Sequence, residues 1–72
     1  MLTLEELKTM HGKPVYVKFI DKDRTLPEVF KDGWVVLSVY NNNVFGTNPG
    51  YTILLSPEMD YGEKVFAYKQ EC

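Results

Sequence analysis

GWVVLSVY, at positions 33–40, is the longest β-prone apolar run in the chain. It begins at an Asp32-Gly33 turn signal and ends at the three asparagines of positions 41–43. Valine, leucine and aromatic side chains suit a pleated, half-buried surface. We therefore expect this run to be the central strand of a β-sheet, with the other segments arranged around it.

Alternation along the strands predicts which side chains form the core, because successive strand residues point to opposite faces of a sheet. In segments 15–20 and 33–40, aliphatic residues on one face alternate with aromatic and polar residues on the other. The predicted core residues are Val15, Val17, Phe19, Val35, Leu37 and Val39. The opposite face carries Tyr16, Lys18, Ile20, Trp34, Val36, Ser38 and Tyr40.

The N-terminal segment predicts a short helix over residues 4–10. Thr3 and Glu6 have the spacing of a capping box, in which each side chain bonds the other residue's backbone amide. Gly12 supplies the stop signal. The apolar stripe at helical spacing, which we expect to fill the core, consists of Leu4, Leu7 and Met10.

The rest of the chain is typical of short strands joined by turns. We expect strands over 44–47, 51–56 and 64–69, a hairpin turn at asparagines 41–43, a type II turn at 48–50 and one helical turn within 56–62. The pattern favours a mainly β fold with one short N-terminal helix, a small five-stranded SH3-like barrel. A single domain is expected over 1–72, with a helical cap at 1–12, the barrel at 14–70 and a tail at 71–72.

Charge and cysteine content exclude several classes of protein. The 72 residues carry a formal net charge of −2 and Arg24 is the only arginine, whereas a generic nucleic-acid binder carries a basic face. Bulk nucleic acid is therefore not an expected partner. No apolar run has the length of a membrane span, and the N-terminus lacks a signal-peptide pattern. Cys72 is the only cysteine, so we expect a reducing bacterial cytoplasm.

Residue sets for catalysis or metal binding are weak in this sequence. His11 follows a helix end and Cys72 lies in the tail, so neither has a rigid neighbour that could orient it as a base or a nucleophile. Positions 21–32 match a calcium loop poorly, because Leu26 replaces the turn glycine and Asp32 replaces the bidentate glutamate. We therefore expect a non-enzymatic protein without a metal or a cofactor.

What remains is a surplus of aromatic and amide side chains. One interpretation is that a thin barrel buries rings on both faces of its bent sheet. The other is a recognition surface, since Tyr and Trp supply hot-spot energy at interfaces and stack on nucleobases. The candidate ligand- or partner-binding residues are Tyr16, Lys18, Arg24, Trp34, Tyr40, Asn42, Phe66 and Tyr68.

Four segments carry a resemblance to a known group of proteins. They are LEEL at 4–7, GKPVYV at 12–17, GWVV at 33–36 and DYGEKVFAYK at 60–69. Together they resemble a group of short proteins from phages and prophages of Firmicutes, many of which end in a YG…W-x-A-Y-[RK] pattern. Val65 stands where that group often has Trp. These motifs are turn glycines and alternating strand residues, and they transfer no catalytic residue.

The resemblance implies a small binding protein from the accessory genes of a phage. Its expected role is counter-defence, either by occluding a host immune protein or by sequestering a nucleotide-derived immune signal. A barrel of this size is nearly solid, so a ligand site is easier to build between copies, and we expect a homo-oligomer. The alternative is a structural or adaptor module of a phage or prophage, a use that SH3-like domains also serve.

Overall fold

The computed structural model of the chain describes residues 1–20 and 31–70. The predicted site residue Arg24, the greater part of the calcium-like loop and the tail at 71–72 lie outside these described residues.

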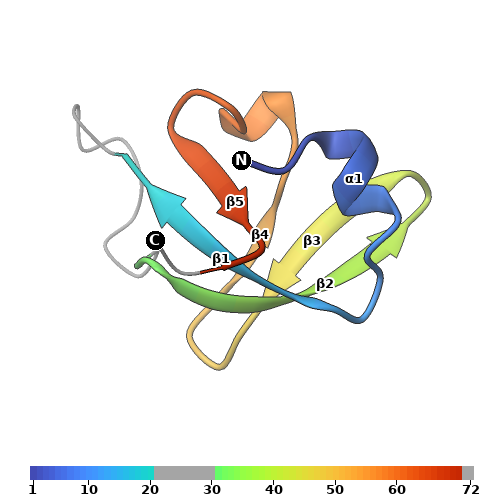
Figure 1. Cartoon of the computed structure of the whole chain (residues 1–72), viewed down its shortest axis with the longest axis horizontal. Coiled ribbons are helices and arrows are strands. Elements are labelled where there is room, and N and C mark those ends of the chain that lie inside the picture. The colour runs from blue at the N-terminus through green and yellow to red at the C-terminus, as the bar shows by residue number, and fades with distance from the viewer. Residues whose placement is uncertain (21–30, 71–72) are drawn as a thin grey trace.

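Five antiparallel strands form one sheet, which is curled into a half-barrel and joined by one short helix (Figure 1). The order of neighbouring strands is β4-β3-β2-β1-β5, so the run at 33–40 is the central strand, as its composition predicts. The elements are α1 (Leu4–Lys8), β1 (Pro14–Phe19), β2 (Gly33–Tyr40), β3 (Asn43–Thr47), β4 (Thr52–Leu54), the 3₁₀ turn η1 (Pro57–Met59) and β5 (Val65–Tyr68). The mainly β architecture is thus confirmed, and it is compatible with a small barrel.

The core lies on the concave side of the curled sheet, where alternation predicts it. Val15, Val17, Val35 and Leu37 are all buried, which confirms the inward face of β1 and β2. Phe19 and Val39, also predicted to be core residues, are only partly buried against it. The other strands and the N-terminal segment add the buried residues Leu2, Leu7, Val44, Ile53, Leu55, Tyr61, Val65 and Ala67.

The helix α1 covers one open end of the curled sheet (Figure 1) and is held by the predicted capping box. Thr3 Oγ1 accepts a hydrogen bond from the Glu6 amide at 3.1 Å, and Glu6 Oε1 accepts one from the Thr3 amide at 3.1 Å. The helix ends at Lys8, two residues earlier than predicted. The reason is a tightened last turn, in which both the amide and the hydroxyl of Thr9 donate to the Glu6 carbonyl.

Two turns differ in how they achieve their geometry. The β2–β3 turn confirms the asparagine prediction, because Asn41 (φ 50°) and Asn42 (φ 66°) both adopt left-handed backbone. The type II prediction for 48–50 is wrong, since Gly50 does not have a positive φ. Instead the Asn48 side-chain oxygen accepts hydrogen bonds from the amides of Gly50 and Tyr51, at 2.7 and 3.0 Å. An Asx turn therefore replaces the glycine-dependent one.

Gly46 is required by close packing between β3 and β2. A Cβ atom at this position would lie 2.8 Å from Val35 Cγ2, whereas a Cβ at Gly33 would have no heavy atom within 4 Å.

We predict that Gly46→Ala lowers the free energy of unfolding by about 1–3 kcal/mol, because the fully buried Val35 must shift. Urea denaturation measures this change, with Gly33→Ala as the matched control. Equal stability of the two variants would contradict the packing described here.

Glu6 gives helix α1 a pH-dependent contribution to stability. The Thr3 backbone amide, and after it the Thr3 hydroxyl, hold the pKa of the Glu6 carboxyl below its ordinary value. A lowered pKa means that this stabilisation is present above the unfolded-state pKa and is lost as the pH falls through the folded-state pKa. We predict that Glu6→Gln, which keeps an acceptor for the Thr3 amide, flattens the acid limb of the unfolding free energy measured against pH. An unchanged acid limb in that variant would refute this role.

Candidate binding site

An aromatic row crosses the outer side of the sheet from β2 through β1 to β5. Tyr16 of β1 is the register partner of Trp34 on one side and of Tyr68 on the other. The rings of Tyr16 and Trp34 meet edge to face, with centroids 5.6 Å apart and planes inclined at 76°. Such pairs are favourable beyond the area that they bury, so the row is an ordered surface of rings.

The residues beside this row extend it into a larger apolar surface. Trp34 and Val36 remain 45% and 49% exposed, although both are large apolar residues. We define the aromatic face as the outward side chains of β1 and β5 and of the first half of β2, which are Pro14, Tyr16, Lys18, Trp34, Val36, Phe66 and Tyr68. This surface lies opposite the core, so its rings are not needed to close the interior.

Lys18 provides a positive charge on the aromatic face. It is the register partner of Phe66, so the two side chains are neighbours on the same face of the sheet. The nearby carboxylate of Asp32 is turned to the backbone, where Asp32 Oδ1 accepts a hydrogen bond from the Phe19 amide at 2.8 Å. A cation beside several rings is the arrangement that suits an anionic ligand with a flat group.

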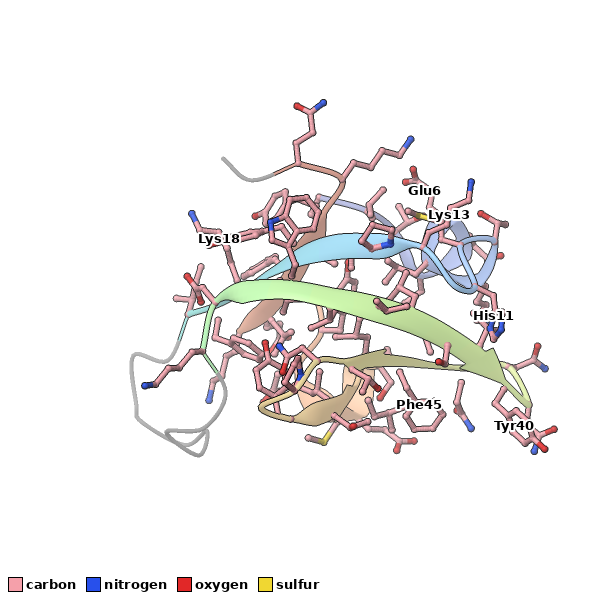
Figure 2. The ribbon with its side chains drawn as sticks, turned by 90° about the horizontal axis from the view of Figure 1, so that it is seen from below. Glu6, His11, Lys13, Lys18, Tyr40 and Phe45 are labelled. Atoms are coloured by element: carbon pink, nitrogen blue, oxygen red, sulfur yellow. The ribbon has the colours of Figure 1, made fainter. Side chains whose placement is uncertain are left out.

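Two predicted site residues lie away from the aromatic face. Figure 2 shows Lys18 and Tyr40 toward opposite ends of the sheet. Trp34 and Tyr40 are six residues apart on one strand, or about 20 Å at strand geometry. Tyr40 is 72% exposed at the end of β2, and Asn42 lies in the turn that follows. The structure thus brings together Tyr16, Lys18, Trp34, Phe66 and Tyr68, and it separates Tyr40 and Asn42 from them.

His11 is part of the sheet edge. Its Nδ1 accepts a hydrogen bond from the Val39 amide at 2.9 Å. The adjoining Gly12 amide donates to the Leu37 carbonyl at 2.6 Å, and the Lys13 carbonyl accepts from the Leu37 amide at 2.9 Å. These bonds continue the pairing of β2 along the residues that precede the start of β1 at Pro14. The imidazole therefore satisfies a strand amide.

Val36 and Ile20 are exposed apolar residues that the sequence-based site list leaves out. Ile20 is 44% exposed just beyond β1, and both residues share the even-numbered alternation of Trp34 and Tyr16. The same alternation that selects the rings would have selected these two aliphatic residues. An exposed aliphatic residue alone is common on protein surfaces, so alternation by itself does not mark it as part of a site.

A separate pocket of about 290 Å³ lies between α1, the β2–β3 turn and the segment that follows β4. It is lined by Leu4, Lys8, Asn42, Asn43, Val44, Leu55, Ser56, Pro57 and Glu58. Asn42 is the only predicted site residue in this lining. The others come from segments far apart in the sequence, so no local motif points to them.

No group of three or more His, Cys, Asp or Glu side chains gathers among residues 1–20 and 31–70. None of the helices in that part of the chain has the length and apolar character that a membrane crossing requires.

The chain matches no protein-family model, and comparisons with curated proteins and with solved structures find no match either. The resemblance to phage and prophage proteins therefore stays a prediction, and the argument for function depends on the surface itself.

Proposed function

We propose that this chain is a small non-enzymatic binding protein that engages its partner through the aromatic face. The observation that carries the proposal is the ordered row of Trp34, Tyr16 and Tyr68 on the outside of a sheet whose core is already closed on the inside. Apolar surface exposed in this way marks an interaction site. Tyrosine and tryptophan are also the residues that contribute most energy at interfaces.

The chemistry of the aromatic face favours an anionic, aromatic partner. Trp34 offers an exposed ring for stacking, at about 1–3 kcal/mol for each base, and Lys18 supplies the positive charge. A nucleotide-type ligand has both a flat base and a phosphate. An aromatic and acidic patch on a protein has the same complementarity, and an experiment with nucleotides distinguishes the two.

The fold class proposed for the curled sheet is a small SH3-like barrel. Its support is the pairing of β1 with both β2 and β5, which brings the last strand back beside the first. The 3₁₀ turn η1 reverses the chain between β4 and β5, and Tyr61 after it bridges to Val65.

The biological role proposed is counter-defence in the cytoplasm of a bacterial host. Its support is the sequence resemblance to phage and prophage proteins, together with a surface suited to stoichiometric occlusion. The target would be a host immune protein or a nucleotide-derived immune signal. The other candidate role is that of a structural or adaptor module, for which the same exposed face would bind a virion or replication protein.

Nucleotide binding is tested by thermal unfolding of the chain with a panel of cyclic nucleotides. We expect at least one member to raise the melting temperature and to be recovered intact on heating. Trp34→Ala should weaken its binding about tenfold or more, because a stacked ring is lost. Tyr40→Ala, which removes a still more exposed ring at the far end of β2, is the matched control and should bind as wild type.

The possible outcomes separate the candidate functions. Turnover of the nucleotide would contradict the non-enzymatic assignment. If no nucleotide of the panel shifts the melting temperature, the proposed partner is a protein. Trp34→Ala should then weaken the binding of that protein. An equal loss of binding affinity in Trp34→Ala and Tyr40→Ala would show that the aromatic face is not the binding surface.

Self-association follows from the same exposed surface. We predict a homo-oligomer at micromolar concentration, because an apolar face on a small chain is most simply covered by a second copy in a symmetric dimer. Light scattering should give at least twice the monomer mass, and Trp34→Lys should reduce it to the monomer by placing a charge in the contact. A strict monomer for the wild-type chain would contradict this prediction.

A further inference from the structure

The pocket between α1, the β2–β3 turn and η1 is lined in part by aliphatic residues. Val44 and Leu55 are among them, and each is only 1% exposed because it belongs to the core. Leu4 of α1 is partly buried and adds aliphatic surface to the lining. At about 290 Å³ the pocket lies just below the range for small-molecule sites, about 300–1,000 Å³. It suits a ligand with a short aliphatic group.

The walls of the pocket carry opposite charges. Lys8 reaches it from α1, one helical turn after Leu4, and Glu58 reaches it from η1. Asn42 and Asn43 add amide groups from the β2–β3 turn. A simple anion would be attracted by Lys8 and repelled by Glu58, and a simple cation the reverse. The charge pattern is therefore complementary to a molecule that carries both signs.

Ser56 contributes an unsatisfied polar group to the wall. Its hydroxyl oxygen is shielded from solvent and has no hydrogen-bond partner among the described residues. The backbone at this position is fixed, because the Ser56 carbonyl accepts from the amides of Met59 and Tyr61 at 2.9 and 3.0 Å. A buried hydroxyl without a partner destabilises a fold. Rotation about χ1 to another staggered position would let it bond a group held in the pocket.

We propose that this pocket binds a free α-amino acid with a branched aliphatic side chain. The carboxylate lies toward Lys8, the ammonium lies toward Glu58, the side chain lies against Leu4 above the core residues Val44 and Leu55, and the Ser56 hydroxyl gains a partner. This site lies outside the aromatic face and goes beyond the proposed function. Success or failure of either proposal is therefore measured independently of the other.

The test is titration of the full chain with L-leucine, followed by calorimetry and by backbone amide NMR. We expect saturable binding, with shifts concentrated at Asn42, Asn43 and Ser56. 4-Methylpentanoate, which is L-leucine without the ammonium, and isoamylamine, which is L-leucine without the carboxylate, are matched probes with the same branched chain. Each should bind with an affinity lower by about tenfold or more, because one charged contact is lost.

Substitutions in the walls locate the binding. Lys8→Ala and Glu58→Ala change exposed side chains, and each should weaken L-leucine about tenfold while the melting temperature of the ligand-free chain stays close to wild type. Ser56→Ala should raise that melting temperature, because an unpaired buried hydroxyl is removed, and should still weaken L-leucine. Trp34→Ala, on the separate aromatic face, should leave L-leucine binding unchanged.

Three results would overturn the proposal. The first is no saturable binding of L-leucine, and the second is equal affinity for 4-methylpentanoate, which would make the pocket a simple anion site. The third is an affinity that Lys8→Ala and Glu58→Ala leave unchanged, which would place L-leucine elsewhere on the chain.

Discussion

The packing of β2 against β3 is the constraint on which the rest of the structure depends. Val35 and Leu37 point into the core and are almost fully buried, and the absence of a side chain at Gly46 lets β3 approach Val35 closely. The five-residue register between β2 and β3, and with it the alternation of inward and outward side chains on β2, is compatible only with a residue as small as glycine at this position.

The same alternation that builds the core creates the surface for function. Because strand side chains alternate between faces, each aliphatic residue turned inward on β1 and β2 leaves its neighbours outside. In this chain those neighbours include Tyr16, Trp34 and Val36. A fold of 72 residues has little stability to spare, so a large exposed apolar face is costly to keep without a partner. The same alternation of side chains thus determines both the core that stabilises the fold and the exposed face that we propose for binding.

Local signals in the sequence predicted local structure well. The asparagine turn gave β2 its observed end at Tyr40, and Thr3 and Glu6 form the expected capping box. Prediction failed where a side chain competes with the backbone: Thr9 shortens the helix, and Asn48 makes the turn that was assigned to glycine. The pocket beside α1 could not be predicted from the sequence, because its walls come from three segments that meet only in the folded chain.

The most direct test of the central role of β2 is amide hydrogen exchange measured residue by residue. The slowest amides exchange only through global unfolding, whereas edge elements open locally. We predict that the amides of β2 that pair with β1 and β3 are the slowest, and that those of the short edge strand β4 exchange faster. Exchange of β2 at rates equal to those of β4 would contradict the account that the sheet is built around this strand.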